Sequence, residues 1–219
     1  AEVWGYRLEN TNPCRSVRPN KRRQCERFLT AQELARFGDV LADLRASDNL
    51  TIRSGCAVIT LLLLTGCRYR EILTLQWQDV KGGRLLLRDS KTGPRTVWLG
   101  SAAREVIASL PRHAKIPWLF WNYQYRRPMR SIQHLWELIL ERAGLGKLRI
   151  HDLRHTFASH AAMSKETLPM IGRLLGHANH QSTARYAHLD DEHLLDAAQQ
   201  VGDAVERLIG RSIEISHNK

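Results

Sequence analysis

The stretch RIHDLRHTFASH, residues 149 to 160, places two histidines four residues apart with an arginine between them. Side chains at i, i+3 and i+4 share one face of a helix, so His151, Arg154 and His155 are candidates for a common site. The spacing matches the zinc-protease pattern HExxH, but Asp152 replaces the glutamate, and the nearby guanidinium disfavours a divalent cation. A guanidinium instead suits phosphate oxygens. On its own, the stretch still favours a simpler interpretation, a structural histidine beside a surface arginine.

Other chemically suited residues are spread along the chain. Arg68 follows a glycine that ends an apolar run, and Glu71 either neutralises this arginine or orients it toward a ligand, since an unpaired buried charge is costly. Lys91 lies in the stretch DSKTGP, from which a flexible ammonium group reaches a substrate, although a single loop lysine is normally only solvated. His177 follows the glycine of LLGH, and Tyr186 lies nine residues further on. These side chains form one site only if the fold brings them together.

Helices are predicted around the first of these residues. Thr30 is an N-cap candidate and Glu33 completes a capping box at the start of TAQELARFGDVLADL. An almost wholly apolar, and therefore buried, helix is expected over residues 50 to 65, with Gly66 closing it. RYREILTLQW predicts a third helix that begins at Arg68. The apolar stripe of the first helix is formed by Leu34, Phe37, Leu41 and Leu44.

The rest of the chain changes period and then returns to helical patterns. The runs RLLLR and RTVWL flank DSKTGP and predict a β-hairpin with a loop of about six residues. Because the strands are few and paired locally, the predicted fold class is mostly α-helical α+β with a small antiparallel β-sheet. Further helices are expected over 101–110, 131–143, 151–162 and 166–175, with a short helix near 182–187 and an acidic amphipathic helix near 190–209.

The charge of the chain indicates the kind of partner. The formal net charge is +11 and the sequence pI is about 10.0. Residues 1 to 186 carry 30 Lys and Arg against 15 Asp and Glu, whereas residues 187 to 219 carry 3 against 7. A basic body favours a polyanion, most often nucleic acid, over a merely solvated cationic surface. The acidic tail is expected to pack on protein, either its own chain or a neighbour's.

The composition favours a cytoplasmic protein. The longest apolar run, AVITLLLL at residues 57–64, is far shorter than the roughly 20 residues of a membrane span, so no membrane partner is expected. The first residues lack the pattern of a secretory signal. The four cysteines have no CxxC spacing and are predicted to be reduced thiols; they are Cys14, Cys25, Cys56 and Cys67.

Five segments occur in the order and at roughly the spacing of the tyrosine recombinases, also called the phage integrase family: TGCRYREI, SKTGPRTVWL, HDLRHTFASH, LLGH and ARYAHL. One motif such as LGH would be weak, but the full ordered set is specific. The resemblance covers about residues 28–188 and implies the catalytic-domain fold of that family. By this resemblance the catalytic residues are Arg68, Lys91, His151, Arg154 and His177, with Tyr186 as the nucleophile.

The resemblance implies site-specific DNA recombination. Tyr186 attacks a backbone phosphorus, expels the 5′-hydroxyl and leaves a 3′-phosphotyrosine, which conserves the energy of the broken ester. The 5′-hydroxyl of another strand then attacks this link, and two such exchanges pass through a Holliday junction. Lys91 is expected to protonate the leaving oxygen. His151 is expected to accept or relay the proton of the tyrosine hydroxyl, whose ordinary pKa is about 10.

The other residues of the set stabilise charge. Arg68, Arg154 and His177 are expected to donate to the non-bridging phosphate oxygens as negative charge builds on them. Because two arginines supply this positive charge, no metal ion or other cofactor is expected. Glu71 and His155 are expected to support the site.

The implied partners are double-stranded DNA attachment sites, which Arg185 and Arg95 are expected to contact. The chain itself is expected to be a monomer when free and a homotetramer on synapsed DNA, with accessory DNA-bending proteins as further candidate partners. Two rival hypotheses remain. One is a type IB topoisomerase-like enzyme that relaxes DNA with similar residues; the other is a basic DNA-binding module without catalysis, which leaves Tyr186 unexplained.

Three regions are expected along the chain. Residues 1–27, which are polar, basic and contain two prolines, are expected to be a linker from a missing N-terminal DNA-binding domain. Residues 28–188 form the catalytic domain, and residues 189–219 an acidic tail helix. In the resembled family such a tail docks onto a neighbouring protomer, although docking within one chain is equally compatible. The apolar face of the tail comprises Leu194, Leu195, Ala198, Val201, Val205 and Leu208.

Overall fold

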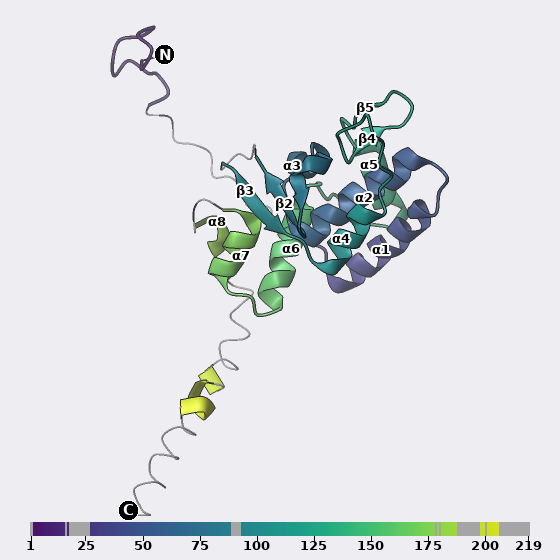
Figure 1. The fold of residues 1–219 in the computed structure, drawn as a ribbon. Helices are drawn as coiled ribbons and strands as arrows, with labels where there is room; N and C mark the ends of the chain where they lie inside the picture. Colours follow the sequence, from purple (N-terminus) through teal and green to yellow (C-terminus); the bar gives the residue numbers. More distant parts are fainter. Residues whose placement is uncertain are drawn as a thin grey trace, which may run out of the picture.

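The structure is a computed structural model that describes residues 2–15, 17, 27–88, 93–177, 179, 181–187, 198–199 and 201–205 (Figure 1). Lys91 and most of the predicted tail helix lie outside these ranges, although residues 198–199 and 201–205 are helical. The described part is mainly helical with two small antiparallel sheets, so the predicted fold class is confirmed. None of its helices is long and apolar enough to cross a membrane.

The first helix, α1 (Ala31–Arg45), begins as its sequence predicts. The Thr30 hydroxyl accepts from the backbone N–H of Glu33, and the Glu33 carboxylate accepts from the backbone N–H of Thr30. Phe37 of α1 meets Trp136 of α5 (Gln133–Arg142) edge to face, with ring centroids 5.7 Å apart. Both rings are almost completely buried, so this pair joins α1 to α5 in the main core.

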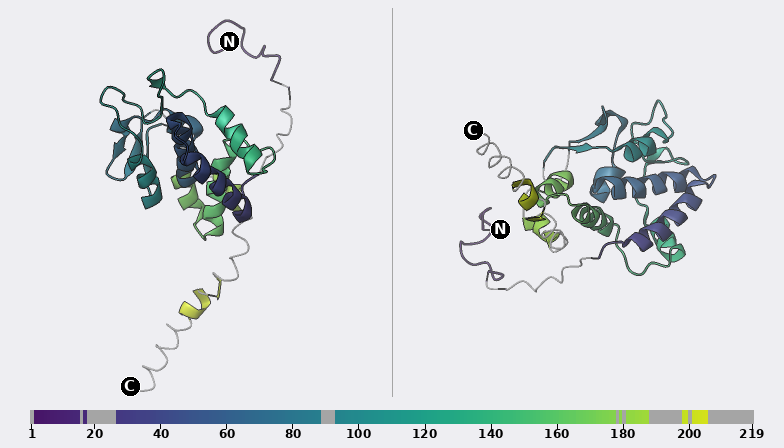
Figure 2. Two further views of the ribbon diagram at one scale, coloured as in Figure 1. Left: turned by 90° about the vertical axis from the view of Figure 1, so that its right-hand side faces the viewer. Right: turned by 90° about the horizontal axis from the view of Figure 1, so that it is seen from below.

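The central element of the fold is α2 (Leu50–Thr65), which packs against α1, α4 (Ser101–Ala108) and α6 (Asp152–Met163). Figure 2 shows this helical body from two further sides. Asn49 caps the first turn of α2, and Gly66 ends the helix in a left-handed conformation with φ of +61°. A helix this apolar requires burial. Its buried position fixes the place where its C-terminal end, and hence Arg68, emerges.

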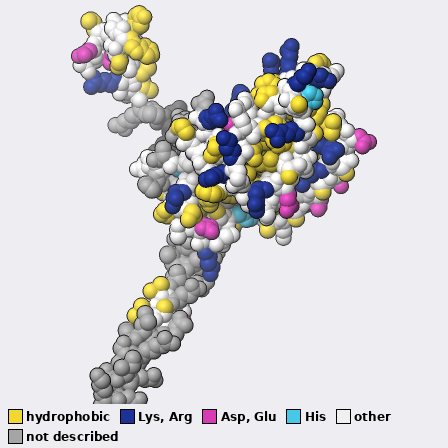
Figure 3. All heavy atoms as spheres, in the orientation of Figure 1, with side chains coloured by type: hydrophobic (Ala, Val, Ile, Leu, Met, Phe, Trp, Pro, Cys, Tyr) yellow, Lys and Arg dark blue, Asp and Glu magenta, His cyan; other side chains and the backbone are white. Residues whose placement is uncertain are grey.

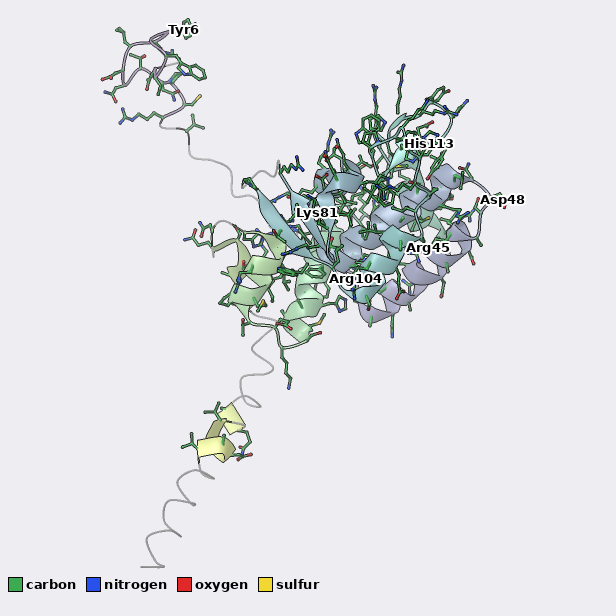
Figure 4. The ribbon with its side chains drawn as sticks, in the orientation of Figure 1. Tyr6, Arg45, Asp48, Lys81, Arg104 and His113 are labelled. Carbon is green, nitrogen blue, oxygen red and sulfur yellow. The ribbon has the colours of Figure 1, made fainter. Side chains whose placement is uncertain are left out.

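The predicted hairpin is present and carries one more strand. β2 (Arg84–Leu87) and β3 (Arg95–Trp98) pair antiparallel, and β1 (Val80–Lys81) pairs with the other edge of β2. In Figure 4 the labelled Lys81 lies in this sheet and Arg104 on the neighbouring α4. The register places three apolar side chains of the hairpin in the main core: Leu85, Leu87 and Val97.

The third predicted helix is shorter than expected. α3 (Tyr69–Leu73) stops because the next residues bond to a distant segment instead of continuing the helix. The backbone N–H of Leu119 donates to the Leu75 carbonyl at 2.9 Å, and the backbone N–H of Trp77 donates to the Pro117 carbonyl at 2.8 Å. Three short elements that were not predicted follow α3 or lie nearby: the 3₁₀ helix η1 (Trp77–Asp79), β4 (Trp121–Asn122) and β5 (Arg127–Pro128). The helix α5 spans Gln133–Arg142.

A second, smaller core lies where α6 meets α7 (Leu168–Leu175) and α8 (Gln181–Ala184), at the side of the sheet in Figure 1. The last of these helices is shorter than the predicted 182–187, and after it the backbone N–H of Tyr186 donates to the Thr183 carbonyl in a turn. The buried side chains of this core are Ala158, Ala162, Ile171, Leu175 and Tyr186.

Candidate active site

Arg154 of α6 is held by two main-chain carbonyl groups. Its Nη1 donates to the carbonyl oxygen of Gly66 at 2.7 Å and its Nη2 to that of Leu175 at 2.8 Å. Both acceptors lie at helix C-termini, where carbonyl groups lack partners within the helix. Burial, followed by the charges of Arg68 and Arg95, lowers the pKa of Arg154 to about 10. The guanidinium therefore stays protonated at neutral pH, and its position is fixed by the ends of α2 and α7.

Glu71 lies between two arginines. Its carboxylate accepts from the backbone N–H of Arg68 and from Arg68 Nη1, both at 2.8 Å, and from Arg95 Nη2 at 2.7 Å. Burial raises the pKa of the Glu71 carboxyl, but the hydrogen bonds from Arg95 and Arg68 outweigh it, so the pKa is lowered. Glu71 thus both neutralises and orients Arg68, the two alternatives that the sequence left open. The Arg68 side chain keeps 23% of its surface exposed for a ligand.

Arg95 points into the protein, with only 10% of its side chain exposed. Besides Glu71, it reaches the carbonyl oxygen of Leu174 with Nη1 at 3.3 Å and the sulfur of Cys67 with Nη2 at 3.6 Å. It also covers Gly176, where an added Cβ would lie 2.6 Å from Arg95 Cδ. This placement does not favour the DNA contact expected for Arg95 from the sequence, because its donors face protein groups. The residue instead joins β3 to the ends of α2 and α7.

His177 follows Gly176, the left-handed residue that ends α7. Its Nδ1 lies 2.8 Å from Oγ1 of the buried Thr183. Burial, followed by the charges of Arg154 and Arg68, lowers the pKa of His177 to about 4, so the ring is neutral at pH 7. When the Thr183 hydroxyl donates to Nδ1, the neutral ring carries its proton on Nε2 and can donate it to a ligand.

Tyr186 is part of the second core and is 5% exposed. Its Oη lies 2.8 Å from Nδ1 of His155, the residue that follows Arg154 on α6. Burial raises the pKa of the Tyr186 hydroxyl, while the charges of Arg185 and Arg154 act in the opposite direction. The candidate nucleophile is therefore a protonated phenol at neutral pH, within electrostatic range of two guanidinium groups.

His151 lies at the exposed start of α6. Its ring stands at 90° to that of His155, with centroids 5.2 Å apart. Asp152, which replaces the glutamate of the HExxH pattern, is buried and is bound by Arg149, with Nη2 2.6 Å from Oδ1. Within the described residues, no three His, Cys, Asp or Glu side chains are grouped so that they could hold a metal ion.

Two predicted residues are not tested by this geometry. Lys91 lies outside the described residues, so its role stays a prediction. Arg185 is half-buried, and its Nε has no hydrogen-bond partner among the described residues, so its DNA contact also stays a prediction. Sequence reasoning missed Thr183 and the carbonyl groups of Gly66 and Leu175. A backbone acceptor carries no side-chain signal, and a threonine three residues before a tyrosine is too common to indicate a function.

Gly66 combines left-handed backbone with tight packing. With φ of +61°, an added Cβ would lie 2.5 Å from Cδ1 of Phe157 and 2.8 Å from Cδ2 of Leu175. Gly66→Ala is therefore expected to lower the free energy of unfolding by more than the roughly 1–2 kcal/mol of left-handed strain, and to displace the carbonyl that holds Arg154. Gly144→Ala is the matched control, since it has the same φ and nothing within 4 Å. Urea unfolding gives the free energy of unfolding of both variants. Equal losses of this free energy in the two variants would contradict the packing argument.

The lowered pKa values of two histidines predict pH-dependent stability. Burial disfavours the charged forms of His155 and His177, whose pKa is about 4 in each case, against an ordinary value of about 6.5. The unfolded chain then binds more protons between these pH values, so the free energy of unfolding should fall as the pH drops from about 6.5 to about 4. Each pKa unit is worth at most about 1.4 kcal/mol. His177→Gln should flatten the thermal-unfolding profile over this range, and an unchanged profile would refute the prediction.

Comparison with known proteins gives a consistent set of relatives. Residues 27–193 match the sequence profile of the Phage integrase family. Tyrosine recombinase XerC of Thermodesulfovibrio yellowstonii is 30% identical, over 84% of this chain and 65% of that protein. Tyrosine recombinase XerC of Chromohalobacter salexigens is 32% identical, over 86% of this chain and 65% of that protein. The chain thus spans 65% of the length of these curated relatives.

Solved structures give the same result. The catalytic domain of bacteriophage HP1 integrase is similar with a TM-score of 0.60 and 27% identity, over 78% of this chain and 93% of that one. The XerH site-specific recombinase, bound to its palindromic difH substrate in a post-cleavage complex, is similar with a TM-score of 0.63 and 25% identity. That match covers 78% of this chain and 52% of XerH.

Proposed function

The chain belongs to the phage integrase family, and from this premise we propose that it is the catalytic part of a site-specific DNA recombinase. It cleaves and rejoins DNA strands through a 3′-phosphotyrosine and a Holliday junction. The observation that carries the proposal is the placement of Tyr186, whose hydroxyl contacts His155 directly beside the buried Arg154. A phenol in range of fixed guanidinium groups is suited to attack a phosphate diester.

The proposed reaction needs no external energy source. Tyr186 Oη attacks a backbone phosphorus, the new O–P bond forms, the bond to the 5′-oxygen breaks, and the phenol loses its proton to a base. The phosphotyrosine keeps the ester energy, so the 5′-hydroxyl of another strand reverses the step and releases the tyrosine. Cleavage and rejoining are the same reaction in opposite directions.

Three donors are proposed to stabilise the charge that builds on the non-bridging oxygens. Glu71 orients Arg68, two carbonyl groups hold Arg154, and Thr183 orients His177. Donors that are already in position cost no reorganisation when the charge develops. Removing one such donor typically lowers the rate about 10²–10³-fold.

Lys91 is proposed as the acid that protonates the leaving 5′-oxygen. Lys91→Ala should cleave ordinary DNA poorly but recover on DNA with sulfur at the 5′ bridging position, because a thiolate leaves without a proton. Single-turnover cleavage of the two substrates measures the recovery. Equally slow cleavage of the sulfur substrate would assign the acid to another group.

Double-stranded DNA at a specific attachment site is the proposed partner. The net charge is +11, and Figure 3 shows Lys and Arg side chains spread over the face that carries the sheet and the β4–β5 hairpin. Such charges contact phosphates and give an affinity for DNA that falls as the salt concentration rises.

We further propose that the protein is cytoplasmic, and that it is a monomer when free and a homotetramer on synapsed DNA. Accessory DNA-bending proteins are proposed as additional partners. Residues 1–27 would lead from a DNA-binding domain, and residues 189–219 would dock on a neighbouring or the same chain.

A pool of nicked duplexes with a randomised central sequence tests the proposal. A cut near the nick releases a short fragment and traps the covalent complex, which is captured under denaturing conditions and sequenced. Tyr186→Phe should form no covalent product, whereas Tyr125→Phe, at an exposed tyrosine, should match the native chain. Absence of a covalent product from the native chain, or formation of one by Tyr186→Phe, would contradict the proposal.

A second experiment separates a recombinase from a type IB topoisomerase, an alternative that the XerC and integrase relatives do not favour. A recombinase transfers the cleaved strand to a second duplex, whereas a topoisomerase only relaxes a plasmid.

A further inference from the structure

His155 makes contacts that the reaction described above does not use. Its Nδ1 lies 2.8 Å from Tyr186 Oη, and the two rings lie with centroids 6.2 Å apart at an angle of 48°. His151, the expected proton acceptor, shares the same helix face one turn earlier but has no hydrogen bond to Tyr186 in the described structure. The tyrosine hydroxyl therefore already faces a ring nitrogen, and that nitrogen belongs to the second histidine of the motif.

We propose that His155, rather than His151, accepts the proton of the Tyr186 hydroxyl during cleavage. This inference rests on the proposed function and assigns the base of that reaction. The geometry follows from the position of each residue on α6. His151 lies at the exposed first turn, whereas His155 is half-buried beside the second core, which contains the tyrosine ring. A general base must lie within hydrogen-bond reach of the proton it takes, and in this structure His155 lies within that reach of the Tyr186 hydroxyl.

The protonation state of His155 fits this role. Burial, followed by the charges of His151 and Arg185, lowers its pKa to about 4, so the ring is neutral at pH 7. A neutral imidazole has one donor and one acceptor nitrogen. With the proton on Nε2, Nδ1 accepts the hydrogen bond from the phenol. Asp152 favours the charged ring while Arg149 opposes it, and a bound DNA phosphate adds negative charge that raises the basicity of His155.

The proton balance closes in both directions. During cleavage the Oη–H bond of Tyr186 breaks toward His155 Nδ1 as the Oη–P bond forms, and the bond to the 5′-oxygen breaks as that oxygen takes a proton from Lys91, the proposed acid. This leaves an imidazolium beside the phosphotyrosine. During rejoining the incoming 5′-hydroxyl forms its bond to phosphorus and gives its proton to the neutral Lys91 amine, while the Oη–P bond breaks and the imidazolium returns its proton to the phenolate. Loss of His155 should therefore slow rejoining as well as cleavage.

Single-turnover cleavage of a trapped duplex with sulfur at the 5′ bridging position tests the assignment, because the leaving group then needs no acid. In His155→Asn the amide oxygen still accepts a hydrogen bond from the phenol but takes no proton. Its cleavage at pH 7 should be about 10²–10⁴-fold slower than that of the native chain. The ratio of the native cleavage rate to the His155→Asn rate should shrink as the pH rises toward the pKa of the phenol, because the tyrosine then ionises without a base. His151→Asn should show no such pH-dependent ratio.

His160→Asn is the matched control, because His160 lies on the same helix but bonds to the carbonyl of Leu29. A deficit of His155→Asn that stays constant with pH would indicate a structural role and overturn the proposal. Cleavage by His155→Asn that is no slower than that of the native chain would also overturn it, as would a pH-dependent ratio for His151→Asn. If the native chain forms no covalent product, the proposed function fails instead. In the free protein, ¹⁵N NMR should show the Nε2–H tautomer of His155, with an Nδ1 signal that shifts in Tyr186→Phe; an Nδ1–H tautomer would also overturn the assignment.

Discussion

Arg154→Lys should reduce single-turnover DNA cleavage by about 10²–10³-fold, although the positive charge is kept. The guanidinium of Arg154 uses Nη1 and Nη2 on the carbonyl groups of Gly66 and Leu175, and in the proposed reaction its remaining N–H groups donate to the phosphate. A lysine ammonium is a single point charge, so it cannot bind both carbonyl groups and still donate to the ligand in a fixed direction. The loss therefore comes from geometry and not from charge.

Stability measurements separate this effect from unfolding. Arg154→Ala leaves two buried carbonyl groups without donors, at a cost of about 1–3 kcal/mol for each, whereas Arg154→Lys should retain part of this stability. Urea unfolding gives these free energies, and the cleavage assay is run only on variants that remain folded. Arg142→Lys, at an exposed arginine of α5, is the control and should behave like the native chain in both assays. Cleavage by Arg154→Lys at nearly the native rate would show that charge alone is sufficient.

Elements with strong local signals were predictable. The capping box of Thr30 and Glu33, the apolar run that ends at Gly66 and the two strands around DSKTGP each lie within a few neighbouring residues, and all three elements are confirmed. The similarity to the HP1 integrase catalytic domain also confirms the catalytic-domain fold implied by the sequence motifs. The two-residue strands β1, β4 and β5 were missed, because so short a strand has no periodicity of its own.

The contacts that build the site were less predictable than its residues. Arg154 reaches one carbonyl group that is 88 residues away in the chain and another that is 21 residues away. His155 meets Tyr186 across 31 residues. Residue type and order indicate which side chains take part, but which donor meets which acceptor depends on how α2, α6 and α7 pack. For this reason the sequence favoured His151 as the partner of the tyrosine, and the structure places His155 there.

Glu71→Gln should be among the most destabilising single changes at the site. The carboxylate is 5% exposed and is the acceptor that both Arg68 and Arg95 share, so the amide leaves two guanidinium groups without a counter-charge close to Arg154. Removing one partner of a buried ion pair typically costs about 3–5 kcal/mol. Cleavage should also fall, because Arg68 loses the side chain that orients it. Urea unfolding and single-turnover cleavage measure the two effects on the same preparation.

A double variant separates the two roles of Glu71. Glu71→Met combined with Arg95→Met removes both charges of the buried pair, and apolar replacements of buried ion pairs are often neutral or stabilising. The free energy of unfolding should therefore recover relative to Glu71→Gln, while cleavage should stay low because Arg68 still lacks its orienting partner. Recovery of cleavage together with stability would mean that the direction of Arg68 is set by another group. Failure of stability to recover would mean that the unpaired charge of Arg95 is not the cause of the loss, and that the packing of β3 against the end of α7 is what Glu71 maintains.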